Sequence, residues 1–184
     1  MNRWQLAQAA VRLRNGAVIL HATEGVWGLA CDAFDRAAVA RLLSLKQRAV
    51  SKGLIVIGAS EADFELELSA LAPGERAAVS NSWPGPVTWL VPNQRFPYWI
   101  TGGRSTVAVR VSGHPQACAL CAEFGGPLVS TSANPSSRPP ALTALKARAY
   151  FPREVDYLLP GAVLHPGRAS SIREVSGAVL RGSG

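Results

Sequence analysis

Short apolar segments that alternate irregularly with helical stretches limit the possible fold more than any other feature of this chain. Segments of strand length occur at residues 17–21, 26–31, 54–57, 87–91, 106–111 and 127–130. Stretches with a helical spacing of apolar residues separate some of these segments but not others. Because strands and helices do not alternate strictly, the pattern predicts one α/β domain around a mixed sheet.

The helical stretches begin at residues that commonly cap helices. Asn2 and Asp35 precede two of them, Ser60 and Pro73 begin two more, and the last of these ends near Trp83. The remaining expected elements are helices at 115–124 and 142–150 and short strands at 157–159, 171–175 and 178–181. The sequence has no internal repeat and no linker, so we expect residues 1–184 to form a single domain.

Composition indicates a folded, basic protein. The apolar fraction of 48% and the mean hydropathy of +0.12 exclude a disordered chain. No apolar run approaches the roughly 20 residues of a membrane span, and no signal peptide is evident, so we expect a cytoplasmic protein without membrane contact. Nineteen Lys and Arg residues against twelve Asp and Glu give a net charge of +7. This charge fits either an ordinary basic surface or a protein that binds an anionic ligand or nucleic acid.

Cysteine and histidine spacing does not predict a metal site. Cys118-x-x-Cys121 lies beside His114, but no second pair completes a tetrahedral site, and Cys31 is distant in sequence. We expect buried, apolar cysteines and a reducing compartment. The histidines are isolated along the chain and receive no catalytic role: His21, His114 and His165.

Three cations fall within seven residues. Lys46 and Arg48 lie at the end of a predicted helix over residues 36–47, and Lys52 lies in the loop before the strand at 54–57. Cations at a helix C-terminus favour the helix dipole, which is a purely structural explanation, but it does not account for Lys52. The sequence contains neither a Walker P-loop nor a G-x-G-x-x-G motif, so phosphate binding here would depend on side chains.

A run of small polar residues follows the strand at 127–130. Ser130, Ser132 and Asn134 point to one side if the chain stays extended, and their hydroxyl and amide groups suit ribose and phosphate oxygens. The alternative is a simple turn before Pro135.

Two further polar positions accompany strands. Thr23 and Glu24 follow a strand and precede Gly25, which is typical of a ligand site or of a turn whose hydroxyl bonds to its own backbone. Arg110 points away from its neighbours Val109 and Val111, so it either clamps a carboxylate or lies in solvent.

These motifs resemble those of the YrdC family when they are taken with Trp83-Pro-Gly-Pro-Val-Thr88, Ser170-Ser-Ile172 and Leu180-Arg181-Gly182. The motifs occur in the family's order from about residue 17 to residue 182. The resemblance implies a twisted, open mixed sheet with flanking helices and a basic concave face. It also implies the synthesis of L-threonylcarbamoyladenylate and pyrophosphate from L-threonine, bicarbonate or CO2, and ATP, for the N6-threonylcarbamoyladenosine modification of tRNA.

The resemblance also implies roles for individual residues. The residues implied to contact threonine are Thr23, Arg110, Ser130 and Ser170. The residues implied to bind ATP are Arg48, Lys52, Thr106, Ser132, Asn134 and Arg181. Lys46, Arg48 and Lys52 are the catalytic candidates, because they would stabilise charge on the phosphates. Mg²⁺ is expected to arrive with ATP rather than in a protein cage. Ala22 and Ala169 stand where the family usually has proline, whereas Trp83 is expected to be structural.

Two other functions fit parts of the sequence. One is an RNA-binding module for double-stranded RNA or tRNA without adenylating activity. The other is the carbamoyl-adenylating part of a hydrogenase-maturation protein, but that protein is much larger. The resemblance further implies that the product passes to a tRNA threonylcarbamoyl-transferase complex.

Overall fold

The strands build one mixed sheet. The computed structural model describes residues 2–182, without the side chain of Arg181. Within this range, nine strands follow the order β7-β1-β2-β6-β3-β5-β4-β8-β9 across the sheet. The pairs β1–β7, β3–β5 and β4–β8 are parallel and the others are antiparallel, which confirms the expected mixed sheet. The strand bounds are β1 Ile19–Ala22, β2 Trp27–Asp32, β3 Ile55–Gly58, β4 Val87–Pro92, β5 Thr106–Val111, β6 Leu128–Ser132, β7 Tyr157–Leu158, β8 Ser171–Glu174 and β9 Val179–Arg181.

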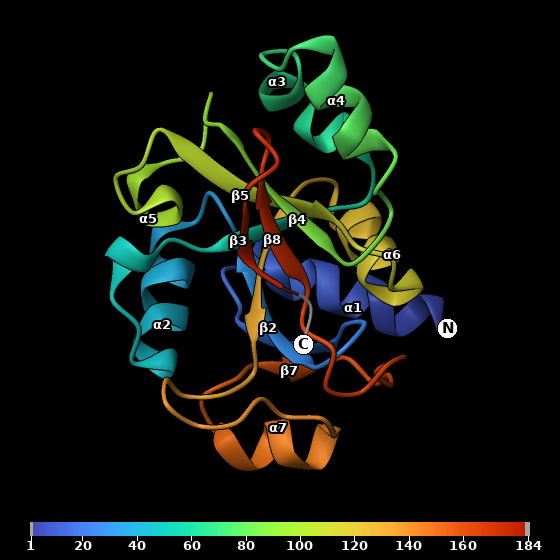
Figure 1. Cartoon of the computed structure of the whole chain (residues 1–184). Helices are drawn as coiled ribbons and strands as arrows, with labels where there is room; N and C mark the ends of the chain where they lie inside the picture. Colours follow the sequence, from blue (N-terminus) through green and yellow to red (C-terminus); the bar gives the residue numbers. More distant parts are fainter. Residues whose placement is uncertain (1, 183–184) are drawn as a thin grey trace.

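Helices flank this sheet and begin largely where the sequence indicates (Figure 1). The Asn2 side chain accepts a hydrogen bond from the Trp4 amide at 3.0 Å. The Asp35 side chain accepts from the amides of Ala37 and Ala38 at 2.9 and 3.0 Å. The helices are α1 Arg3–Arg14, α2 Arg36–Lys46, α3 Glu65–Leu68, α4 Pro73–Ser80, α5 Tyr98–Thr101, α6 Pro115–Phe124 and α7 Ala144–Tyr150, with 3₁₀-helices η1 Val50–Lys52 and η2 Glu61–Phe64.

Two apolar clusters lie on opposite faces of the sheet. The smaller cluster joins α1 and α6, which lie side by side, to Ile57 of β3 and Leu128 of β6 (Figure 1). The larger cluster packs α2, α7 and the η2–α4 region against alternate strand residues such as Val56, Val109 and Val129. Because successive side chains of a strand point to opposite faces of the sheet, neighbouring strand residues belong to different clusters.

The face that carries α1 and α6 also carries the polar residues of interest. Arg110 pairs in register with Ile57, and Ser130 pairs with Ala30, so each shares a face with a residue of the smaller cluster. The expectation that Arg110 points opposite to its valine neighbours is confirmed, because Val109 and Val111 belong to the larger cluster.

The structure differs from the expected elements in several places, among them the helix expected from Ser60, which is divided into η2 and α3, and helix α7, which begins at Ala144 rather than at residue 142. Strand β6 runs on to Ser132, because Thr131 and Ser132 pair with Leu29 and Gly28. Helix α5 and the 3₁₀-helix η1, which contains Lys52, were not expected. Each is a single turn that ends at a glycine with positive φ, and one turn carries no apolar periodicity.

Trp83 is structural, as expected. Its indole is buried and donates from Nε1 to the Val87 carbonyl at 2.7 Å. In residues 2–182, no helix has both the length and the apolar composition that a membrane crossing requires.

Candidate active site

One cavity of about 650 Å³ brings the motifs together. Its lining comes from the ends of α2 and β6, from η1, β3 and β5, and from the loops at 23–26 and 168–170. Ten of the eleven residues assigned to the site from the sequence line it: Thr23, Lys46, Arg48, Lys52, Thr106, Arg110, Ser130, Ser132, Asn134 and Ser170. The side chain of the eleventh, Arg181, lies outside the described residues, although its backbone ends strand β9.

Lys46 joins the last turn of α2 to the end of β6. Its Nζ donates to the carbonyls of Ser132 and Asn134, the latter at 2.9 Å. Burial, together with the charge of Arg48, lowers the pKa of Lys46 to about 8. The helix dipole therefore accounts for only part of its placement, since the ammonium is held inside the molecule against two carbonyls at the cavity wall.

Arg48 and Lys52 follow Lys46 around a sharp change of chain direction. Gln47 ends α2 in the left-handed conformation with φ of 50°, and Arg48 donates from Nη2 to the Gly53 carbonyl at 2.9 Å. Lys52 is exposed at the end of η1. Because both side chains line the same cavity, the structure brings together the cations that sequence spacing suggested.

The Ser130–Asn134 segment forms the part of the cavity wall that Lys46 contacts. Ser130 and Ser132 belong to β6, and the Asn134 side chain donates from Nδ2 to the carbonyls of Pro135 and Arg138. These hydrogen bonds form the turn at Pro135 that sequence analysis gave as the alternative to a ligand site. Asn134 nevertheless lines the cavity, so the turn does not exclude a role in binding. The Asn134 Oδ1 atom is buried and has no hydrogen-bond partner among residues 2–182.

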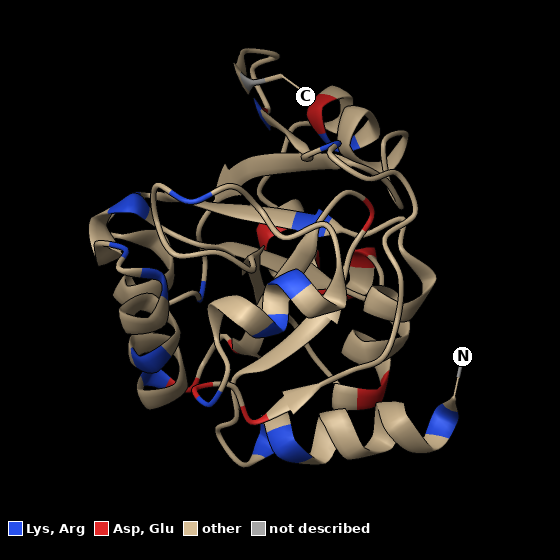
Figure 2. Cartoon of the chain, turned by 90° about the horizontal axis from the view of Figure 1, so that it is seen from below, with Lys and Arg blue, Asp and Glu red and all other residues tan. Residues whose placement is uncertain are grey.

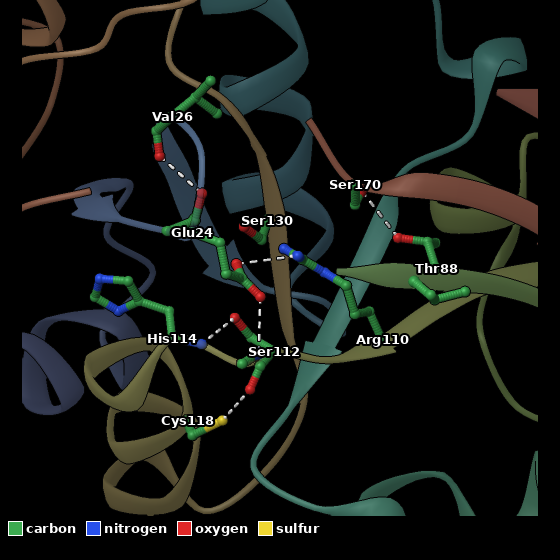
Figure 3. A network of polar contacts seen from close by, with 12 residues as sticks. Glu24, Val26, Thr88, Arg110, Ser112, His114, Cys118, Ser130 and Ser170 are labelled. Carbon is green, nitrogen blue, oxygen red and sulfur yellow. Dashed lines mark hydrogen bonds and ion pairs between the residues drawn. The ribbon is translucent and has the colours of Figure 1, made fainter. Parts of the chain in front are cut away.

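Arg110 is held by Glu24, a residue to which sequence analysis assigned no role (Figure 3). Arg110 donates from Nη1 to a Glu24 carboxylate oxygen at 3.0 Å, and the Gly113 amide donates to the other oxygen at 2.7 Å. Burial raises the pKa of Glu24, but Arg110, Gly113 and the Ser112 hydroxyl outweigh this effect and lower it overall. The Thr23–Glu24 pair was a visible signal, but only the fold places Glu24 beside Arg110.

Arg110 is buried rather than solvated. Its side chain is 8% exposed, and its Nε atom is buried with no hydrogen-bond partner among residues 2–182. Since Nη1 is engaged by Glu24, the edge formed by Nε and Nη2 is the one suited to a two-pronged contact with a ligand carboxylate.

Thr23 and Ser170 approach the same end of the cavity. The Thr23 hydroxyl donates to the Val26 carbonyl at 2.7 Å, which is the turn geometry expected as the alternative to a ligand site. Its oxygen can still accept a hydrogen bond while it lines the cavity. The Thr88 hydroxyl donates to the Ser170 hydroxyl at 3.2 Å (Figure 3).

Two cations at the cavity were missed by sequence analysis. Arg104 lies in the loop between α5 and β5, and Arg168 lies in the segment before β8. Both are exposed residues in irregular segments, where no periodic spacing marks them.

The charges that line the cavity are almost all positive. Among the described lining residues there is one carboxylate, Glu24, and there are six cations: Lys46, Arg48, Lys52, Arg104, Arg110 and Arg168. Figure 2 shows further Lys and Arg residues on helices and loops elsewhere, so the cavity explains only part of the net charge of +7. The site suits a ligand with several negative charges, next to a smaller ligand that carries a carboxylate.

Comparisons with known proteins found similar sequences over almost the whole chain. The family model Sua5_yciO_yrdC, described as "Telomere recombination", matches residues 11–183. The threonylcarbamoyl-AMP synthase of Halorhodospira halophila (strain DSM 244 / SL1) is 47% identical over 180 residues, which cover 97% of this chain and 94% of that protein. The threonylcarbamoyl-AMP synthase of Cellvibrio japonicus (strain Ueda107) is 48% identical over 177 residues, which cover 95% of this chain and 94% of that protein.

Solved structures show the same fold. The crystal structure of P. abyssi Sua5 complexed with L-threonine superposes with a TM-score of 0.93 at 29% identity, and the match covers 100% of this chain and 55% of that one. The crystal structure of E. coli YciO gives a TM-score of 0.87 at 21% identity over 99% of this chain and 90% of that one, a likeness of fold alone.

Proposed function

Because this chain belongs to the Sua5/YciO/YrdC family, we infer that it makes threonylcarbamoyl-AMP, the product that names the curated relatives of similar length. The substrates of this reaction are L-threonine, bicarbonate or CO2, and ATP, and pyrophosphate is the second product. The product supplies the threonylcarbamoyl group of N6-threonylcarbamoyladenosine in tRNA. The RNA-binding alternative without adenylating activity finds no counterpart among these relatives, which are named as synthases.

The reaction joins two anions, and positioning is its main requirement. The threonine amine forms an N–C bond with CO2 and loses a proton, which gives a carbamate. A carbamate oxygen then attacks the α-phosphorus of ATP, and the bond to the β-phosphate oxygen breaks as pyrophosphate leaves. No covalent bond to the protein is needed, so catalysis rests on holding both substrates and on stabilising charge.

The main structural support for the proposed function is the division of the cavity into two parts that differ in charge. At one end the neutralised pair Arg110–Glu24 offers one guanidinium edge, next to small hydroxyl groups. At the other end the cations Lys46, Arg48 and Lys52 gather, whereas Glu24, the one carboxylate among the described lining residues, lies beside Arg110. An amino acid with one carboxylate fits the first part, and a triphosphate fits the second.

We propose corresponding roles for the lining residues. Threonine lies against Thr23, Arg110, Ser130 and Ser170, which supply hydroxyl groups and a carboxylate clamp. The phosphates of ATP lie against Lys46, Arg48 and Lys52, whose charges stabilise the transfer. The nucleoside lies towards Thr106, Ser132 and Asn134, which line the cavity together. Arg104 and Arg168 add positive charge to the cavity, Arg168 from the segment that packs on the 23–26 turn, and Arg181 remains a proposed ATP contact on the basis of the family motif.

The donor set of the cavity does not fit a protein-held Mg²⁺. Of the described lining residues, Glu24 has the one carboxylate, and Arg110 and Gly113 occupy its oxygens. We therefore propose that Mg²⁺ is carried on the phosphate oxygens of ATP, and we assign no step to it.

The further partners are proposals as well. We propose that the product passes to a tRNA threonylcarbamoyl-transferase complex and that tRNA itself is a possible ligand of the basic surface. The cytoplasm is the proposed location, because ATP and tRNA are available there.

A substrate-omission assay tests the function. Pyrophosphate release from ATP by the purified chain should require both L-threonine and bicarbonate. Removal of either one should reduce release to the rate without protein. Release that continues without threonine would contradict the proposed function.

A further inference from the structure

The buried side chain of His21 contacts Ser130, although sequence analysis treated the histidine as isolated. His21 lies in β1 and is 0% exposed, and its Nε2 atom is 3.2 Å from Ser130 Oγ. Strand β2 separates the two strands, and Gly28 of β2 pairs with His21. A Cβ atom at Gly28 would lie 3.0 Å from His21 Nε2, so this glycine leaves the space through which the imidazole approaches Ser130.

The imidazole is neutral at physiological pH. Burial lowers the pKa of His21 to about 4, with further lowering from His114 and Arg110. A neutral imidazole carries a single N–H group, on either Nε2 or Nδ1. The position of this proton decides which way the Ser130 hydroxyl can point.

The surroundings of Nδ1 favour one of the two tautomers. Nδ1 is buried, and no hydrogen bond of ordinary geometry reaches it from residues 2–182, although the Ala22 backbone makes the smallest of the contributions to the pKa of the ring and raises it. A buried N–H group without a partner is rarer than an acceptor without one. The proton therefore belongs on Nε2, where it donates to Ser130 Oγ.

A donating His21 leaves the Ser130 hydroxyl proton free for the cavity, which Ser130 lines. We propose that His21 is a positioning residue that turns the Ser130 hydroxyl proton towards the cavity, where it donates to an anionic oxygen of threonine or its carbamate. This inference rests on the proposed function, and it specifies that Ser130 serves as a donor rather than as an acceptor.

The tautomer can be measured directly in the wild-type chain. The chain has three histidines, so nitrogen-15 chemical shifts of labelled histidine give a simple spectrum, which a His21→Phe spectrum assigns. The proposal expects a neutral His21 with the proton on Nε2 between pH 6 and pH 8. A proton on Nδ1 would overturn it, and this result does not depend on whether the chain makes threonylcarbamoyl-AMP.

A double-mutant cycle tests the coupling to function. Ser130→Ala and His21→Phe should each raise the threonine KM about 10-fold, and the double variant should be no worse than either single one. The ATP KM should stay within about twofold of wild type in all three variants. His21→Gln retains an N–H donor and should restore part of the loss, which keeps the test informative if the phenylalanine variant folds poorly.

Two outcomes of the cycle contradict the proposal. Effects of His21→Phe and Ser130→Ala that multiply in the double variant would show that His21 does not act through Ser130. An equal rise in the KM for ATP would show a general disturbance of the cavity. By contrast, a wild-type chain without threonine-dependent pyrophosphate release would remove the proposed function itself, while the tautomer measurement would stand.

Discussion

At the residue scale, the side chains of this cavity are held by the protein itself. Glu24 holds Arg110, two carbonyls hold Lys46, and the Gly53 carbonyl holds Arg48. Such contacts reduce the reorganisation that is needed when charged substrates bind. They also mean that each polar side chain has both a structural and a chemical task, and substitutions must be designed to separate the two.

Arg110→Ala should raise the threonine KM by about 100-fold or more, because two charge-assisted hydrogen bonds of roughly 1.5–3 kcal/mol each are lost. The ATP KM should change little. Arg110→Lys keeps a positive partner for the buried Glu24, and so protects the fold, but it should not restore threonine binding fully because an ammonium lacks the planar edge. Steady-state kinetics with each substrate varied separately measure both effects. A rise in the ATP KM with an unchanged threonine KM would show that Arg110 binds ATP rather than threonine.

The affinity for ATP should fall as the pH rises through about 8, because the pKa of Lys46 is lowered to about 8 and only its protonated form attracts phosphate. Phosphate groups are already ionised in this range, so the fall reports the protein. The decline should not exceed about tenfold per pH unit for a single group. Calorimetry of ATP binding at pH 7, 8 and 9 measures it. Lys46→Arg, whose side chain stays charged, should flatten the profile, and an unchanged slope in that variant would assign the titration to another group.

At the element scale, an irregular segment completes the threonine end of the cavity. The amides of Leu164 and His165 donate to the Glu24 carbonyl, and the Gly167 amide donates to the Gly25 carbonyl. The segment at 160–170 thereby crosses the 23–26 turn and leads into Ser170. The 23–26 turn thus positions Arg110 through the Glu24 side chain. The backbone carbonyls of the same turn position the segment that leads to Ser170.

Gly25→Ala should disturb this crossing, because a Cβ atom at Gly25 would lie 1.7 Å from the backbone oxygen of Arg168. Backbone cannot yield as a flexible side chain can, so the 160–170 segment must move. We expect a loss of stability of about 1–3 kcal/mol and a clear rise in the threonine KM. Gly74→Ala is the matched control, since nothing lies within 4 Å of a Cβ there. Thermal unfolding and steady-state kinetics on both variants test this prediction. Equal stability and equal threonine KM values in the two variants would show that the contact between Gly25 and the 160–170 segment is not tight.

Sequence patterns anticipated the elements better than they anticipated side-chain partners. Helix α6 and strand β5 have the expected bounds, because capping residues and alternation are local signals. The Glu24–Arg110 pair spans 86 positions, and the His21–Ser130 contact spans 109. No local pattern encodes such distances, so these partners became visible only once the sheet had been assembled.

At the scale of the whole molecule, charge is arranged so that a basic cavity opens on one face of an otherwise well-packed sheet. The smaller apolar cluster under α1 and α6 closes part of this face, and the uncovered part holds the site. The lining cations give the cavity a positive electrostatic potential, which should attract polyanions to it.

The double substitution Arg48→Ala/Lys52→Ala should abolish measurable pyrophosphate release and weaken ATP binding, at about 1.5–3 kcal/mol for each lost contact. The melting temperature should fall only modestly, because Lys52 is exposed and Arg48, although it donates to the Gly53 carbonyl, lies outside both apolar clusters. Calorimetry at two salt concentrations, with ATP and with tRNA, separates the enzyme from an RNA-binding module. No binding of ATP by the wild type, with tRNA affinity that falls in the variant, would favour the module.

Phosphorus-31 NMR of the products shows whether this chain joins a threonine carbamate to the α-phosphate of ATP. With L-threonine, bicarbonate and MgATP, we expect equal amounts of pyrophosphate and of an AMP adduct whose mass is that of threonylcarbamoyl-AMP. Formation of ADP and inorganic phosphate, or of free AMP independent of threonine, would contradict it.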